Sequence, residues 1–133
     1  MRYFLLTLSL ILITQPVYSK HLYMEKEYQQ VWCNQKQGSL EYRLTDGTRV
    51  DCVTNTHAIE FDFASKWAES IGQSLYYGKT LNKKTGVVLI MENPQNDLRY
   101  LKRLQSIAST YDITIWTMTP NDMTKYVLVT NKK

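Results

Sequence analysis

The fold of this chain is decided by residues 41–77, which read EYRLTDGTRVDCVTNTHAIEFDFASKWAESIGQSLYY. Apolar and polar side chains alternate along this stretch, a pattern typical of strands with one buried face. Turn-forming residues interrupt the alternation at Thr45-Asp46-Gly47 and again at Asn55-Thr56. The sequence therefore predicts an antiparallel meander of three short strands, at residues 40–44, 48–54 and 58–63.

The hydrophobic pattern also predicts which residues face one another in the first hairpin. If Gly47 is left-handed in a three-residue loop, Leu40 lies opposite Cys52 and Glu41 lies opposite Asp51. One face is then apolar and the other charged. A two-residue turn would mix the two kinds of side chain on both faces, so we expect the first register.

The second hairpin extends the charged face into a row of acids. It sets Cys52 opposite Ile59 and Asp51 opposite Glu60. Glu41, Asp51 and Glu60 would then lie about 5 Å from their neighbours across three strands. Carboxylates this close repel one another unless something positive lies between them. The row predicts either a divalent-cation site or a well-solvated edge of the sheet.

A helix is predicted to follow at residues 64–77, ending at Gly78. Lys66, Gln73 and Tyr77 are spaced seven and four residues apart, so they fall within about 20° of one line along it. We expect this polar line to border the acidic row. The predicted buried stripe of the helix consists of Ala64, Ala68, Ile71 and Leu75.

The other expected elements complete an α/β (α+β) fold. They are a helix at 22–35 ended by Gly38, a buried strand at 87–91, a helix at 94–111, a strand at 113–118 and an edge strand at 126–130. The central sheet should be mixed: an antiparallel three-strand meander followed by helix-strand-helix-strand, with helices on both faces. No linker or repeat divides residues 20–133, so we expect one domain.

The first nineteen residues are predicted to be a signal peptide. Arg2 precedes an apolar run at residues 4–13, and Val17 and Ser19 suit cleavage after Ser19. An uncleaved anchor or a buried helix is the alternative, although the run is shorter than the roughly 20 residues that span a bilayer. Removing Arg2 lowers the net charge from +4 to +3. This mild excess permits binding to a polyanion and does not require it.

Cys33 and Cys52 are the two cysteines of the chain. An exported protein meets an oxidising compartment, so we predict a disulfide between them, with two free thiols as the alternative. A zinc site is not expected, because His21 and His57 show no ligand spacing relative to the cysteines.

The segment from Glu41 to Tyr77 resembles the PD-(D/E)XK nuclease superfamily. Asp51, preceded by Val50 rather than proline, is similar to the first acid of the family motif. Glu60-Phe61-Asp62 stands where the family has acid-x-lysine, and Lys66 one helical turn later could supply the ammonium. Gln73 and Tyr77 resemble the Gln-xxx-Tyr motif of the RecB-type branch. The resemblance implies a restriction endonuclease-like core.

The resemblance also implies a chemistry. Asp51 and Glu60, with a contribution from Glu41, would bind Mg²⁺ or Mn²⁺, which lowers the pKa of a water molecule and neutralises charge on the phosphate. Asp51, Glu60, Lys66 and Gln73 would be the catalytic residues. Tyr77, Lys79, Lys83 and Lys84 would contact the nucleic-acid backbone.

Each of these residues also has an ordinary structural interpretation. Glu41 could be a solvent-facing strand residue, and Asp51 and Asp62 could form surface salt bridges with Arg49 or Lys66. Two functions are therefore considered: an exported metal-dependent nuclease, with DNA as the foremost substrate, or an inactive periplasmic or secreted binding module of the same fold. The sequence contains no Ser/His/Asp arrangement and no phosphate-binding glycine loop, which leaves acyl transfer and nucleotide hydrolysis unsupported.

Overall fold

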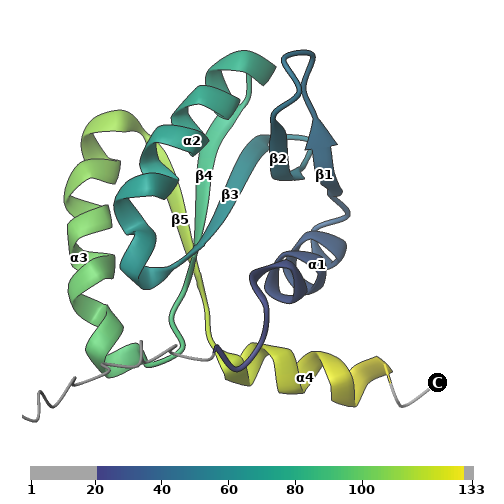
Figure 1. Cartoon of the computed structure of the whole chain (residues 1–133), viewed down its shortest axis with the longest axis vertical. Helices are drawn as coiled ribbons and strands as arrows, with labels where there is room; N and C mark the ends of the chain where they lie inside the picture. Colours follow the sequence, from purple (N-terminus) through teal and green to yellow (C-terminus); the bar gives the residue numbers. More distant parts are fainter. Residues whose placement is uncertain (1–20, 131–133) are drawn as a thin grey trace, which may run out of the picture.

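A computed structural model of the chain describes residues 21–130, which form a five-stranded mixed sheet with helices on both sides (Figure 1). The elements in order are α1 (Glu25–Gln35), β1 (Ser39–Arg43), β2 (Arg49–Val53), β3 (His57–Phe63), the 3₁₀ turn η1 (Ala64–Lys66), α2 (Trp67–Leu81), β4 (Lys84–Ile90), α3 (Pro94–Tyr111), β5 (Ile113–Met118) and α4 (Pro120–Thr130). The strands lie side by side in chain order. β1, β2 and β3 pair antiparallel, whereas β3, β4 and β5 pair parallel. The predicted mixed α/β architecture with its meander is confirmed.

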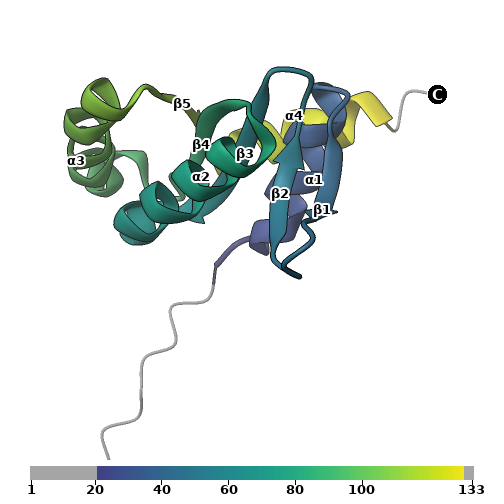
Figure 2. The same ribbon diagram turned by 90° about the horizontal axis from the view of Figure 1, so that it is seen from above.

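Two apolar layers hold the helices against the sheet. α1 and α4 pack on one face, where Ile59, Phe61 and Val88 belong to one cluster of buried side chains. α2 and α3 cover the other face, on which Val87 and Leu89 are buried (Figures 1 and 2). Consecutive residues of β4 therefore enter opposite layers, which explains its continuous apolar sequence.

The last described segment is a helix, so the edge strand predicted at residues 126–130 is wrong. α4 begins after Thr119, with Pro120 in its first position. The backbone N–H and hydroxyl of Thr119 both donate to Asp122 Oδ2, at 2.8 and 3.0 Å. Asp122, the third residue of the helix, thus accepts from both donors of the residue before it, and proline at the first position favours a helix there.

α2 is longer than predicted, and its predicted buried stripe is confirmed at Ala64, Ile71 and Leu75, which pack in one apolar cluster, but not at Ala68. It runs past Gly78 and ends at Asn82, which adopts the left-handed conformation. Gly78 is required inside the helix by close packing, because a Cβ there would lie 2.4 Å from Thr85 Oγ1 on β4. Ala68 is exposed rather than buried. Ser70 and Ser74 are fully buried instead, and their hydroxyls donate to backbone carbonyls of the same helix. α1 begins at Glu25 rather than at residue 22.

The predicted strand register is confirmed at the apolar positions. Leu40 pairs with Cys52, and Cys52 pairs with Ile59. Gly47 is left-handed, with a φ of 88°. In the described chain, the ladder between β2 and β3 consists of two pairs and stops before Asp51. The backbone of Glu41 is itself left-handed, with a φ of 52°. Glu41, Asp51 and Glu60 therefore do not form the regular row of paired strand residues that was predicted.

A disulfide joins Cys33 on α1 to Cys52 on β2, as predicted. Both residues are fully buried, and their Cα atoms are 5.8 Å apart. Gly38 crosses directly over the bond, since a Cβ there would lie 2.6 and 2.7 Å from the two Sγ atoms. The cross-link therefore ties α1 to the meander, and the chain between them needs glycine at this crossing.

None of the helices within residues 21–130 has both the length and the apolar character needed to cross a membrane. The signal peptide predicted for residues 1–19 lies outside the described residues.

Candidate acidic cleft

A cleft of about 520 Å³ opens between the β1–β2 hairpin, the start of α1 and the middle of α2. Figure 2 shows the hairpin standing beside α1, with α2 on the other side of β3. The residues that line the cleft are Glu25, Lys26, Gln29, Glu41, Gly47, Thr48, Arg49, Asp51, Glu60, Gln73 and Tyr77. Four of them are acids and two are bases, so an acidic surface is concentrated at this point of a chain that is basic overall.

Glu60 is the most deeply buried acid of the cleft. It retains 5% of its accessible surface, and its Oε2 has no hydrogen-bond partner among the described residues. Burial raises the pKa of Glu60 well above its ordinary range, and the charges of Asp51 and Asp62 raise it further. An unpaired buried carboxylate is costly, so this group favours either a proton or a cation.

Asp51 lies at the point where β2 leaves β3. Its Oδ2 accepts the backbone N–H of Phe61 at 2.8 Å, which replaces the interrupted ladder. Burial raises the pKa of Asp51, although the hydrogen bond from Phe61 opposes the shift. The charges of Glu25 and Glu41 act in the same direction as burial. Asp51 and Glu60 thus share one poorly solvated, negatively charged environment.

Glu41 reaches the same cleft but is held by a base. Its Oε2 lies 3.0 Å from Nη1 of Arg49, and both side chains are largely exposed. This ion pair differs from the salt bridges considered from sequence, in which Asp51 or Asp62 pairs with Arg49 or Lys66. Glu41, Asp51 and Glu60 therefore line one cleft, but the first of them has a separate partner.

Asp62 and Lys66 lie next to the cleft rather than in its wall. Asp62 is 5% exposed, and burial followed by the charge of Glu25 raises its pKa to about 7. The ammonium of Lys66 opposes that shift, and it also opposes the rise that burial causes in the pKa of Glu25. Lys66 is exposed, and within residues 21–130 it makes no ion pair. The charge of Lys66 therefore acts mainly on the carboxyl groups of Asp62 and Glu25.

Gln73 and Tyr77 line the cleft from α2. Gln73 is exposed, whereas Tyr77 is 6% exposed and packs with Val50 and Ala58. Burial raises the pKa of the Tyr77 phenol, and the charges of Glu60 and Asp51 raise it further. An amide and a neutral phenol are thus presented beside the buried acids.

Three of the residues predicted to contact nucleic acid are not in the cleft wall. Lys79, Lys83 and Lys84 follow one another around the end of α2 and the start of β4. Lys83 Nζ donates to the carbonyl of Asn55 at 2.9 Å, so this lysine closes the β2–β3 turn. Lys79 and Lys84 are exposed.

Sequence analysis missed Glu25, a fourth acid of the cleft. It lies on the first turn of α1, and burial raises its pKa. Gln29, which is 4% exposed, donates from Nε2 to Glu25 Oε1 at 3.3 Å. Nothing in the sequence near Glu25 predicts this position, because it depends on how α1 docks against the meander.

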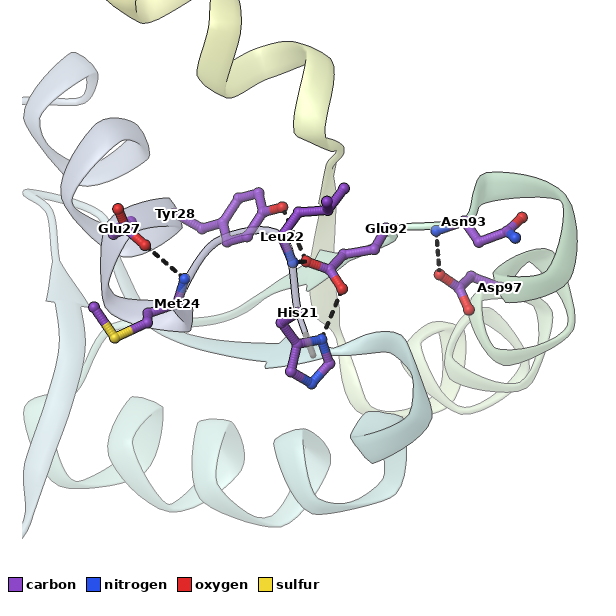
Figure 3. Close-up of polar contacts among 8 residues, drawn as sticks. All are labelled: His21, Leu22, Met24, Glu27, Tyr28, Glu92, Asn93 and Asp97. Carbon is purple, nitrogen blue, oxygen red and sulfur yellow. Dashed lines mark hydrogen bonds and ion pairs between the residues drawn. The ribbon is translucent and has the colours of Figure 1, made fainter. Parts of the chain in front are cut away.

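Glu92, two residues after β4, contributes to that docking (Figure 3). Its carboxylate lies 2.7 Å from His21 Nδ1, accepts the backbone N–H of Leu22 at 2.9 Å and contacts the hydroxyl of Tyr28 at 3.4 Å. Tyr28 is fully buried on α1, and Phe63 stacks on the His21 ring. One side chain therefore joins the chain after β4 to the segment that enters α1. Together with the Cys33–Cys52 disulfide, it positions the helix that carries Glu25.

The donor set suits a hard divalent cation, because the cleft offers several carboxylate oxygens and one of them is unpaired. The ligands are not preassembled. Among residues 21–130, no three His, Cys, Asp or Glu side chains are already grouped closely enough to hold a metal ion. The Asp51 bond to Phe61 and the Glu41 pair with Arg49 show which groups would have to rearrange.

Comparison with known proteins gives no match to a family model, to a curated protein or to a solved structure.

Proposed function

We propose that this chain is an exported, metal-dependent nuclease with a restriction endonuclease-like core, which hydrolyses phosphodiester bonds in nucleic acid, DNA foremost. The proposal is carried by Glu60, a buried carboxylate in an acidic cleft, one oxygen of which has no hydrogen-bond partner within residues 21–130. Leaving a buried acceptor unpaired costs about 1–3 kcal/mol, and more if it is charged. A bound cation would supply the missing partner.

The arrangement of the elements supports the same function. Acids on β2 and β3 meet at the cleft, and the next helix brings Gln73 and Tyr77 to its wall. This order of strands and helix matches the PD-(D/E)XK pattern on which the sequence resemblance rests. The disulfide supports export, since such bonds persist in oxidising compartments.

A divalent cation, Mg²⁺ or Mn²⁺, held by Asp51, Glu60 and Glu41, would lower the pKa of a water molecule and neutralise charge on the phosphate. Gln73 and Tyr77 would hydrogen-bond the phosphate or a water molecule. Lys66 would supply the ammonium that the motif otherwise carries at the position of Asp62.

A nuclease assay tests the proposal directly. The mature protein is incubated with linear, circular and single-stranded DNA and with RNA, in Mg²⁺, in Mn²⁺ or in EDTA. We expect cleavage that depends on the cation and disappears in Asp51→Asn and Glu60→Gln. Glu69→Gln is the matched control, because Glu69 is an exposed acid on α2 that does not line the cleft. Cleavage that persists in EDTA, or equal activity of all three variants, would contradict the proposal.

A second function, a binding module without catalysis, is favoured by one observation. Asp62 occupies the motif position of the lysine, and it is buried, while Lys66 is exposed and does not line the cleft. Such a protein would bind nucleic acid or a partner protein and leave it intact. Cation-dependent binding of DNA without cleavage, in any of the conditions above, would select this function.

A further inference from the structure

Arg49 and Glu41 form an ion pair at the mouth of the acidic cleft. Arg49 and Lys26 are the two cationic residues among those that line it, beside four acids. A phosphodiester approaching this surface is repelled by the acids, and an unoccupied guanidinium would offset that repulsion. The side chain of Arg49 is 65% exposed, so nucleic acid could reach it without a change in the backbone.

The ion pair uses only some of the N–H donors of the Arg49 guanidinium. The recorded contact joins Nη1 to Glu41 Oε2, whereas a guanidinium carries five N–H donors in a fixed fork. The pair is also weak, since exposed ion pairs contribute about 0–1 kcal/mol. Glu41 can therefore leave Arg49 for another cation, and Arg49 can leave Glu41 for another anion, at a small cost in free energy.

Glu41 also lies within electrostatic reach of the buried acids. Its charge raises the pKa of both Asp51 and Glu60. A doubly charged cation near those acids attracts the Glu41 carboxylate more strongly than one exposed guanidinium does.

We propose that Arg49 is a phosphate-binding residue of the cleft, paired with Glu41 until a divalent cation draws that carboxylate away. This inference rests on the proposed function and adds an order of events to it. Cation binding frees the Arg49 fork, which then contacts a phosphate of the nucleic acid through two N–H donors. Metal and nucleic acid therefore bind with positive coupling, and each raises affinity for the other.

The test measures binding of a fluorescent single-stranded DNA oligonucleotide to the full mature protein by anisotropy, with Ca²⁺ or EDTA. Gel analysis confirms that the oligonucleotide stays intact. The variants are Arg49→Gln, Glu41→Gln and the double variant. Arg43→Gln is the control, because Arg43 pairs with Arg49 across the same hairpin, carries the same charge and does not line the cleft.

Three results are expected. Arg49→Gln weakens binding in Ca²⁺ about tenfold and lowers the slope of log affinity against log salt by about one, whereas Arg43→Gln changes binding less. Glu41→Gln binds DNA more tightly than wild type in EDTA, because Arg49 is already free. The double variant loses that gain.

Equal effects of Arg49→Gln and Arg43→Gln would overturn the role of Arg49. An unchanged affinity of Glu41→Gln in EDTA would overturn the exchange of partners. Both comparisons remain decisive if Ca²⁺ has no effect on wild type, a result that counts against the proposed metal-dependent function itself.

Discussion

The carboxylate of Asp51 accepts the backbone N–H of Phe61 at 2.8 Å, at the point where the β2–β3 ladder ends. One side chain thus replaces a backbone hydrogen bond and also lines the acidic cleft. Asp51 therefore has a structural role, the hydrogen bond to Phe61, and a proposed role in metal binding, and substitutions can separate the two.

Asp51→Asn and Asp51→Ala are predicted to differ in stability while both abolish metal binding. Asparagine keeps an acceptor for the Phe61 N–H and removes a partly buried charge, so we expect its free energy of unfolding at neutral pH to equal or exceed that of wild type. Alanine leaves the Phe61 N–H without a partner and should cost about 1–3 kcal/mol. Urea denaturation measures both. Equal stability of the two variants would show that the hydrogen bond contributes nothing.

The stability of the metal-free protein is predicted to fall as pH rises. Burial raises the pKa of Asp62 to about 7, from an ordinary value near 4, and also raises the pKa of Glu60. The folded state then holds more protons than the unfolded state above about pH 4. The stabilisation is complete below that pH and is lost as pH rises through 7 and above.

Glu60→Gln isolates this effect. Glutamine stays neutral, so the variant should gain about 1–3 kcal/mol over wild type at pH 8 and little at pH 4. Thermal melting in EDTA across this range gives the difference between the two proteins. The same comparison for Glu69→Gln, which removes an exposed acid outside the cleft, should show a much smaller gain at pH 8. A Glu60→Gln curve parallel to wild type would show that Glu60 is charged and solvated in the folded protein.

Divalent cations are predicted to reverse the loss of stability at high pH. Mn²⁺ at one hundred times its Kd at pH 8 would add about 2.7 kcal/mol. The same concentration would add less at pH 5, because carboxylates must lose their protons to bind the ion. Thermal shift and calorimetry measure the response. Glu60→Gln should abolish it, whereas Arg43→Gln should retain it. A wild-type melting temperature that does not change when Mn²⁺ is added at pH 8 would contradict the proposed metal site.

How far the sequence predicts this structure depends on whether a feature is local. The meander, its apolar register and the bounds of α3 and β5 follow from alternation, helical periodicity and turn residues. α4 was missed because the apolar, β-branched residues near the end of the chain resemble a strand. Its start signal, Pro120 at the first position with Asp122 accepting the N–H of Thr119, is nevertheless visible in the sequence.

The site was less predictable, because its geometry arises from tertiary contacts. Glu25 enters the cleft through the docking of α1, to which Glu92, distant in sequence, contributes by binding the segment before the helix. The regular acidic row was expected from an uninterrupted ladder. The ladder stops before Asp51, and Glu41 is left-handed, neither of which alternation can reveal.

The disulfide and Gly38 are predicted to be coupled energetically. Closing the loop between Cys33 and Cys52 should contribute about 3 kcal/mol, so the Cys33→Ala/Cys52→Ala variant should lose about that amount. Gly38→Ala should also destabilise the oxidised protein, because its Cβ would lie within 2.7 Å of both sulfur atoms. Removing the sulfurs makes room for that methyl group. Gly38→Ala should therefore cost clearly less in the double-alanine background than in wild type, as measured by a cycle of urea denaturation experiments. Equal costs in the two backgrounds would mean that Gly38 is needed for the backbone conformation of the loop and not for contact with the disulfide.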